Sequence, residues 1–167
     1  MNLFLLRHGI AVELGTSGYE RDADRPLTPK GERRLARIAD AMEAMGLAFD
    51  LILSSPYTRA KQTAEIVANA LGLKKKLEFS ENLTPGGDAR ALIAALNKLE
   101  PRPENILLVG HEPYLSDLMA TLTSGDSRMT IDFKKGGLCK LEIESLRHGR
   151  CATLAWLLTP RQMGLMG

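Results

Sequence analysis

Short continuous runs of apolar residues alternate along the chain with longer segments in which apolar residues recur every three or four positions. The clearest continuous runs are residues 3–6, residues 51–53 within the segment 49–53, and residues 106–109. Runs of this length are typical of strands that are buried on both faces of a parallel sheet. We therefore predict strands at these three places. A shorter strand is predicted within residues 74–79, where a solvated turn of three lysines comes first.

The periodic segments predict four amphipathic helices, each opened by a capping side chain or a proline. The residues expected at the four helix starts are Thr28 with Pro29, Ser55 with Pro56, Asp88, and Pro113. Glycine is expected at the ends of three of these helices, because it adopts the left-handed backbone conformation that terminates a helix. These terminating glycines are Gly46, Gly72 and Gly125.

The last third of the chain has a different pattern. Apolar and charged residues alternate over residues 139–144, as in a strand with one solvated face. Residues 152–158 predict a final strand, joined to the previous one by a turn around His148 and Gly149. This order predicts an α/β three-layer sandwich with a mainly parallel sheet, one antiparallel strand and helices on both faces. No linker interrupts the pattern, so residues 1–167 are expected to form a single domain.

Composition narrows the class of protein. The chain is 44% hydrophobic and 25% charged, which is ordinary for a globular protein. Its net charge of +2 gives no indication that it binds nucleic acid or an anionic membrane. Cys139 and Cys151 are too few for a disulfide scaffold and are expected to be reduced thiols. Residues 3–6 are too short an apolar run to span a bilayer or to form a signal peptide. We expect a cytoplasmic protein with no nucleic-acid or membrane partner.

Three of the predicted strands run directly into residues that carry chemistry. The first ends in an Arg-His-Gly tripeptide at residues 7–9, and the second leads to two serines, a proline and then Arg59. The strand at residues 106–109 ends in a Gly-His dipeptide at residues 110–111. In an open parallel sheet the carboxyl ends of the strands lie along one edge, where ligands bind. The sequence therefore predicts a site with two imidazoles, two guanidinium groups and at least one helix N-terminus.

Such a set of groups suits a tetrahedral dianion such as a phosphoryl group. Arginines donate bidentate hydrogen bonds to phosphate oxygens, and helix N-termini add backbone donors and partial positive charge. A neutral imidazole at His8 can attack phosphorus and form a phosphohistidine, while a protonated imidazole at His111 can donate to the equatorial oxygens. No cluster of carboxylates accompanies these histidines in the sequence, so we expect no metal site.

The tripeptide at residues 7–9 is a weak signal by itself, because the same tripeptide recurs at residues 147–149. The second copy follows charged residues rather than an apolar run, and we interpret it as a hairpin loop with a solvated histidine. Two acidic residues near the predicted site leave alternatives open. Glu112 can orient its neighbour His111, act as an acid or cap a helix, with the cap favoured, and Glu13 is interpreted as a loop charge.

Four segments together resemble the histidine phosphatase superfamily, which is also called the phosphoglycerate-mutase-like family. They are residues 3–9, 25–31, 53–63 and 109–111. The compact size and loop pattern look like the SixA-type protein phosphohistidine phosphatases. The resemblance implies a cofactor-independent phosphatase with His8 as the nucleophile. The residues that it assigns to catalysis are His8, His111, Arg7 and Arg59. Those that it assigns to phosphate or substrate binding are Arg7, Gly9, Arg25, Arg59 and His111.

One departure from the family pattern bears on the substrate. Larger members carry a glutamate as general acid in a Leu-x-Glu segment, and the corresponding segment here is Leu83-Thr84-Pro85. Glu81 and Asp88 are nearby but out of register. An alkyl phosphate releases an alkoxide that needs a proton, whereas a phosphohistidine can leave as a neutral imidazole that is protonated on its own ring. Residues 73–103 also leave little room for a lid, which predicts an open, shallow pocket.

The sequence thus predicts a phosphatase that hydrolyses phosphohistidine on a protein through a covalent intermediate at His8. Its expected partner is a phosphorylated histidine-containing phosphotransfer protein in signal transduction. Two alternatives are a broad-specificity phosphatase of small phosphoesters and a non-catalytic module that binds phosphate. The presence of two imidazoles favours an enzyme, because binding alone needs no nucleophile.

Overall fold

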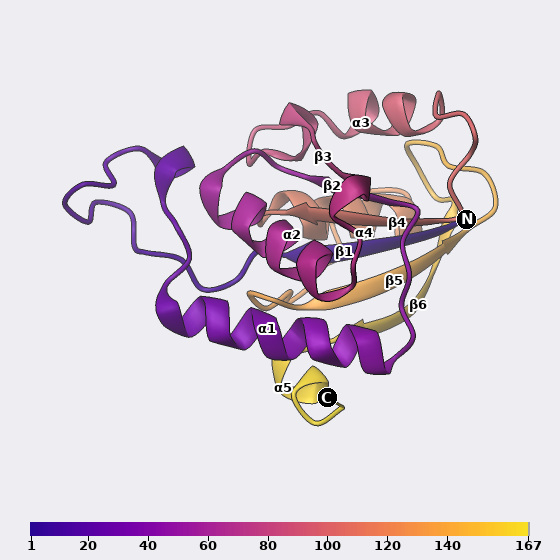
Figure 1. The fold of residues 1–167 in the computed structure, drawn as a ribbon. Coiled ribbons are helices and arrows are strands. Elements are labelled where there is room, and N and C mark those ends of the chain that lie inside the picture. Colours follow the sequence, from indigo (N-terminus) through magenta and orange to yellow (C-terminus); the bar gives the residue numbers. More distant parts are fainter. Residues whose placement is uncertain (167) are drawn as a thin grey trace.

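The computed structural model describes residues 1–166 and contains a six-stranded sheet (Figure 1). In spatial order the strands are β3 (Leu77–Phe79), β2 (Leu51–Ser54), β4 (Asn105–Gly110), β1 (Asn2–Arg7), β5 (Leu138–Ile143) and β6 (Ala152–Leu158). The first four pair in parallel, whereas β5 pairs antiparallel with both β1 and β6. The prediction of a mainly parallel sheet with one antiparallel strand is confirmed, because β5 runs against the other five strands.

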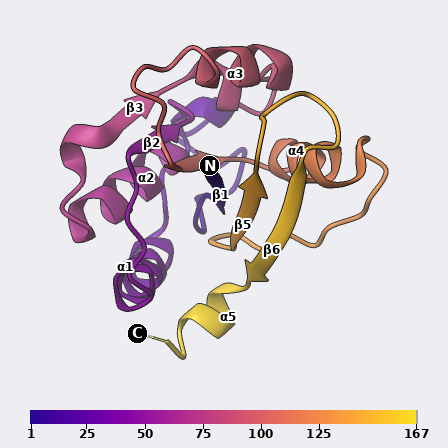
Figure 2. The same ribbon diagram turned by 90° about the vertical axis from the view of Figure 1, so that its right-hand side faces the viewer.

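Helices cover both faces of the sheet, as the three-layer prediction requires. On one face lie α1 (Pro29–Ala44), α2 (Thr58–Ala70) and the short α5 (Pro160–Met163); on the other lie α3 (Ala89–Leu96) and α4 (Tyr114–Ser124) (Figures 1 and 2). Each face has its own apolar core. Leu3 and Leu5 belong to the core under α3 and α4, while Phe4 and Leu6 belong to the core under α1 and α2. A strand that is buried on both faces therefore needs an unbroken apolar run.

Most helix ends follow the predicted pattern. The Thr28 side chain accepts a hydrogen bond from the Gly31 amide at the start of α1, and Asp88 accepts from two amides in the first turn of α3. Pro113 immediately precedes α4. The predicted terminating glycines all have a positive φ; they are Gly46, Gly72 and Gly125.

The start of α2 differs from the prediction. The helix begins at Thr58, so the expectation that Ser55 caps it with Pro56 at its first position is wrong. The Ser55 hydroxyl instead accepts a hydrogen bond from the Tyr57 amide at 3.2 Å and lies 2.8 Å from a ring nitrogen of His111. Ser55 therefore connects the turn after β2 to the residue that follows β4.

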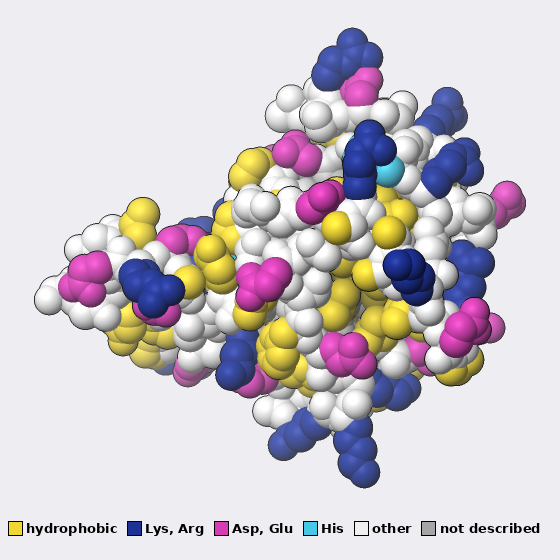
Figure 3. Space-filling view, turned by 90° about the horizontal axis from the view of Figure 1, so that it is seen from above, with side chains coloured by type: hydrophobic (Ala, Val, Ile, Leu, Met, Phe, Trp, Pro, Cys, Tyr) yellow, Lys and Arg dark blue, Asp and Glu magenta, His cyan; other side chains and the backbone are white. Residues whose placement is uncertain are grey.

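The segment between β1 and α1 forms a long loop that leaves the body of the protein (Figures 1 and 3). A β-bridge between Ala11 and Leu27 and a hydrogen bond from the Thr28 amide to the Ile10 carbonyl close the base of this loop. Gly31 is required at this closure, since a Cβ there would lie 2.1 Å from the Ile10 oxygen. Near its end the loop forms a 3-10 turn, η1 (Asp22–Asp24).

The remaining sequence predictions concern exposed segments and thiols. The predicted third strand is shorter than residues 74–79, because its three exposed lysines form the 3-10 turn η2 (Lys74–Lys76). His148 is exposed in the connection between β5 and β6, as predicted for the second Arg-His-Gly tripeptide. Cys139 and Cys151 are both free thiols. Among residues 1–166, the structure has no helix with the length and apolar character needed to cross a membrane.

Candidate active site

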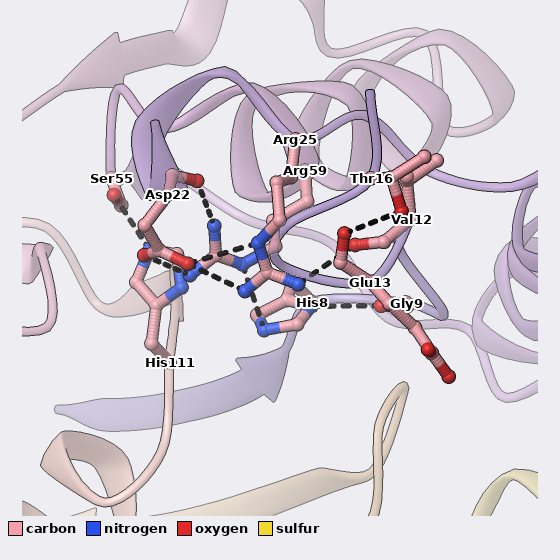
Figure 4. A network of polar contacts seen from close by, with 10 residues as sticks. All are labelled: His8, Gly9, Val12, Glu13, Thr16, Asp22, Arg25, Ser55, Arg59 and His111. Carbon is pink, nitrogen blue, oxygen red and sulfur yellow. Dashed lines mark hydrogen bonds and ion pairs between the residues drawn. The ribbon is translucent and has the colours of Figure 1, made fainter. Parts of the chain in front are cut away.

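The carboxyl ends of β1, β2 and β4 meet at one edge of the sheet. There the His8 amide donates to the Gly110 carbonyl at 3.0 Å, which places the residues that follow β1 and β4 side by side. The ring centroids of His8 and His111 are 5.1 Å apart. Arg59 reaches them from the first turn of α2 (Figure 4). The structure therefore brings together the groups that the three strand ends predicted.

His8 is buried, with 6% of its surface exposed. Its Nδ1 lies 2.7 Å from the Gly9 carbonyl oxygen, and because a carbonyl oxygen only accepts, the ring hydrogen is assigned to Nδ1. Burial is the main reason why the pKa of His8 falls from 6.5 to about 2, and the nearby charges of Arg59 and Arg7 add to this. The ring is therefore neutral near neutral pH, and its Nε2 carries the lone pair of a nucleophile.

Arg59, in the first turn of α2, contacts the nucleophilic nitrogen of His8. Its Nε donates to Nε2 of His8 at 3.2 Å, and the guanidinium is buried, with 3% of the residue exposed. Its other two nitrogens donate to Asp22, one to the backbone carbonyl at 2.7 Å and one to the carboxylate at 2.9 Å. Burial lowers the pKa of Arg59, and Asp22 opposes that effect. Arg59 thus links the loop after β1 to the attacking atom.

His111 is the second imidazole and is 1% exposed. Its Nε2 lies 2.8 Å from the Ser55 hydroxyl, and its buried Nδ1 has no hydrogen-bond partner among the described residues. Burial, with a contribution from the charge of Arg59, lowers the pKa of His111 from 6.5 to about 3. This low pKa favours a neutral ring at His111, whereas the sequence interpretation considered a protonated one. A neutral ring whose Nε2 accepts from Ser55 still carries one N–H, on Nδ1, that can donate to an oxyanion.

Arg7 lies at the edge of the site. Its Nη1 donates to the Phe133 carbonyl at 2.6 Å, and its Nε is buried without a partner among residues 1–166. Burial lowers the pKa of Arg7, and the negative charges of Glu112 and Asp132 oppose that effect. An unpaired buried N–H is costly, so a phosphate oxygen that accepted from it would remove that cost.

Asp22 is a site residue that the sequence interpretation missed. Its carboxylate accepts from Arg25 at 2.6 and 2.9 Å and from Arg59 at 2.9 Å, so that two guanidinium groups converge on it (Figure 4). Burial acts to raise the pKa of Asp22, but the hydrogen bonds from Arg25 and Arg59 outweigh it and hold the pKa below 3.8. The local signal was the three-residue spacing between Asp22 and Arg25, which places them on one side of a helical turn.

Gly9 shapes the site through its backbone. Its carbonyl accepts from His8, and its amide lies 3.1 Å from the Thr63 hydroxyl of α2. A Cβ at this position would lie 2.5 Å from a methyl carbon of Leu35 in α1. The Gly9 carbonyl therefore orients the His8 ring, and the close packing of α1 and α2 leaves no room for a side chain at Gly9.

The acidic residues considered from the sequence serve local structure. Glu112 accepts from the Ser116 amide at 3.0 Å and from its hydroxyl, which confirms the helix-capping interpretation. Glu13 is exposed on the loop after β1, Asp88 caps α3, and Glu81 is exposed. In the segment at residues 83–85, Thr84 is buried and its hydroxyl donates to the Glu81 carbonyl. No carboxylate stands in that segment.

Comparisons with known proteins fit this geometry. A family model of the histidine phosphatase superfamily (branch 1) matches residues 3–84. The phosphohistidine phosphatase SixA homolog of Haemophilus influenzae is 33% identical over 132 residues, which cover 73% of this chain and 77% of that protein. The phosphohistidine phosphatase SixA of Escherichia coli K12 is 29% identical over 161 residues, which cover 96% and 94%. A solved structure of the protein histidine phosphatase SixA with tungstate is 27% identical, has a TM-score of 0.81 and covers 96% of this chain and 98% of that one.

The chain therefore belongs to the histidine phosphatase superfamily, and it is a phosphatase. Within the superfamily it is a member of the SixA type, as its compact size and loop pattern predicted. The family match includes His8, Arg25 and Arg59, whereas His111 lies beyond it and joins them through the pairing of β4 with β1.

Proposed function

We propose that this phosphatase hydrolyses phosphohistidine on a partner protein through a phosphohistidine intermediate at His8. The observation that carries the proposal is the neutral His8 ring, whose hydrogen is on Nδ1 and whose Nε2 lone pair faces the Arg59 guanidinium. In the first step Nε2 attacks phosphorus and the P–N bond to the substrate imidazole breaks. That imidazole leaves neutral, with the proton that its other ring nitrogen already carried. In the second step water attacks the phosphorus on His8, releases inorganic phosphate and restores the neutral ring.

In this proposal the phosphoryl group binds among Arg7, Arg25, Arg59 and His111. Arg25 and Arg59 donate hydrogen bonds to the Asp22 carboxylate in this structure. The three equatorial oxygens of a bound phosphoryl group can accept hydrogen bonds from the same guanidinium groups. The unpaired Nδ1 of His111 and Nε of Arg7 supply two further donors. Preorganised donors around the transferred group are the main source of catalysis in phosphoryl transfer.

The preference for phosphorus on nitrogen rests on the missing acid. The segment at residues 83–85 holds no carboxylic acid, and Asp22 is a poor proton donor because two arginines hold its pKa below the ordinary value. An alkoxide leaving group therefore lacks a nearby acid among these residues. A substrate phosphohistidine is less affected, because its second ring nitrogen can carry the proton before the P–N bond breaks.

A trapping experiment with radiolabelled phosphohistidine protein tests the nucleophile. Wild type is expected to retain acid-labile, alkali-stable phosphate, and His8→Ala is expected to lose it. The matched control is His148→Ala, which changes the second Arg-His-Gly tripeptide and is expected to trap phosphate as wild type does.

A substrate panel tests the leaving group by comparing kcat/KM for a phosphohistidine protein, phosphoserine and an aryl phosphate. We expect the phosphohistidine protein to exceed phosphoserine by about 10²-fold or more, the usual contribution of a general acid. Comparable values for both would favour a broad-specificity phosphoester phosphatase. Binding of phosphate without trapping or turnover of any of the three would favour a non-catalytic phosphate-binding module.

A further inference from the structure

A groove lined by basic residues leads away from the proposed phosphate pocket. One cavity of about 710 Å³ lies between the chain before β5, the end of β6 and the start of α1, and Arg7 lines it. A second cavity of about 440 Å³ lies between α1 and α5, which pack side by side (Figures 1 and 2). The two cavities are adjacent, because they share Arg34, Pro160 and Arg161, and we call them together the basic groove. Its Lys and Arg residues are Arg7, Arg34, Arg37, Lys134, Lys135 and Arg161.

The charge of the basic groove is poorly balanced. These six cationic side chains face one lining carboxylate, Asp132, which is paired with Lys134 at 2.5 Å. Arg34, Lys135 and Arg161 are exposed, and none of them forms an ion pair with a carboxylate of residues 1–166. The whole chain has a net charge of only +2, so this positive charge is concentrated locally. A concave surface of one sign attracts a ligand of the opposite sign.

We propose that the basic groove binds an acidic segment of the phosphorylated partner protein while the phosphohistidine enters the pocket at His8. The proposal rests on the function proposed above, because it describes how the substrate of that reaction docks. Arg7 joins the two regions, since it lines the groove and directly precedes His8 at the end of β1. In this proposal a segment next to the phosphorylated residue contacts the groove while the phosphoryl group binds beside Arg7.

The other residues of the groove favour a protein segment over other anions. Its lining includes the apolar side chains of Ile10, Ile38 and Leu165, of which Leu165 is 84% exposed. Acidic protein segments combine carboxylates with apolar side chains, which such a lining can contact. Single-stranded nucleic acid is usually held by stacking on aromatic rings, and none of the described residues that line the groove is aromatic.

Two synthetic peptides of equal length test the proposal. Each contains a single histidine, flanked on both sides by Glu in one peptide and by Gln in the other. Binding of the unphosphorylated peptides is measured by fluorescence anisotropy. KM is measured after phosphoramidate has phosphorylated the histidine. The groove variant is Lys135→Glu/Arg161→Glu, which leaves the proposed phosphate pocket intact and places a carboxylate in the first turn of α5, where the helix dipole favours it.

The matched control is Lys74→Glu/Lys75→Glu. It changes the net charge by the same amount at exposed lysines that precede β3, at the end of the parallel strands opposite to the proposed pocket. Wild type and this control are expected to bind the Glu peptide about tenfold more tightly than the Gln peptide at low salt, with a matching difference in KM. Added salt is expected to remove most of the difference. The groove variant is expected to lose the preference while hydrolysing free phosphohistidine within about twofold of wild type.

Equal binding of both peptides by wild type, or a preference that survives in the groove variant, would overturn the proposal. Discrimination in binding without hydrolysis of either peptide would remove the proposed function and leave the groove assignment standing. Hydrolysis of both peptides with equal KM would support the proposed function and overturn the groove assignment. A groove variant that loses affinity for a DNA oligonucleotide or anionic vesicles, yet keeps its preference for Glu, would assign the groove to a different ligand and also overturn the proposal.

Discussion

At the scale of single residues, the carboxylate of Asp22 occupies hydrogen-bond donors that a phosphoryl group needs. It accepts from both Arg25 and Arg59. We predict that Asp22→Asn tightens inhibition by inorganic phosphate by about tenfold, the effect of about 1.4 kcal/mol, because a neutral amide competes less well for two guanidinium groups than a carboxylate. The inhibition constant in a steady-state assay measures this effect.

Asp24→Asn is the matched control for that prediction. Asp24 is exposed on the same 3-10 turn and pairs with Arg21 at 3.6 Å, away from the two site arginines. Its replacement is expected to leave phosphate inhibition unchanged. Weaker inhibition in Asp22→Asn would contradict competition and show that the carboxylate holds the arginines in their binding positions.

Ser55 gives a second prediction at this scale. Its hydroxyl is shared between the Tyr57 amide and His111, so Ser55→Ala leaves two polar groups without that partner. We predict a loss of about 1–3 kcal/mol in the free energy of unfolding, measured by urea titration, together with a lower kcat/KM. Ser54→Ala is the control, because among residues 1–166 the equally buried Ser54 hydroxyl bonds only to the Ser55 carbonyl. This variant is expected to leave kcat/KM unchanged. An unchanged kcat/KM in Ser55→Ala would show that His111 does not depend on this contact.

Single residues also show where prediction from the sequence succeeded and failed. The buried run before residues 7–9 distinguished His8 from the exposed His148, although both lie in the same tripeptide. Asp22 was missed, because its spacing to Arg25 is a weak local signal and its contact with Arg59 spans 37 residues. The sequence also did not reveal how completely the ring of His111 is buried, and this burial is what lowers its pKa.

At the scale of elements, the closure between the loop after β1 and α1 depends on Gly31. A Cβ at Gly31 would meet the Ile10 backbone oxygen, which the loop closure holds in place. We predict that Gly31→Ala lowers the free energy of unfolding by about 1–3 kcal/mol, as overpacking usually does. Gly86→Ala is the control, since nothing lies within 4 Å of a Cβ there. Equal urea midpoints for the two variants would show that the closure opens without cost.

The elements themselves were predictable where a short stretch of sequence determines them. Thr28 and Asp88 cap their helices as expected, because a capping side chain bonds within its own turn. The start of α2 was not predictable in the same way. There the Ser55 hydroxyl is engaged by His111, which follows another strand, and the helix starts at Thr58 instead.

At the scale of the whole molecule, the position of the site followed from the direction of the strands. Parallel strands with continuous apolar runs had to place residues 8, 55 and 111 at one edge, and they do. The basic groove could not be predicted, because its cations come from four separate segments that only the fold brings together. Nothing in the spacing of Arg34, Lys135 and Arg161 along the chain indicates that they share a surface.

The two buried histidines make the stability of the whole molecule depend on pH. Their pKa values in the folded protein are lowered to about 2 for His8 and about 3 for His111, from 6.5. Below pH 6.5 the unfolded chain therefore binds protons that the folded protein does not. The stability from burying neutral rings is fully present above pH 6.5 and is lost as pH falls toward the folded pKa values, by about 1.4 kcal/mol per pH unit for each histidine.

Urea unfolding between about pH 6 and about pH 4.5 tests this slope. Replacing His111 with Asn removes one of the two titrating rings, so the histidine contribution to the slope is expected to fall by half. We infer that residues 1–167 unfold as a single domain, so Trp156 fluorescence and far-ultraviolet circular dichroism are expected to give coincident transitions at each pH. Equal slopes in wild type and His111→Asn would mean that the ring of His111 becomes protonated without unfolding the protein.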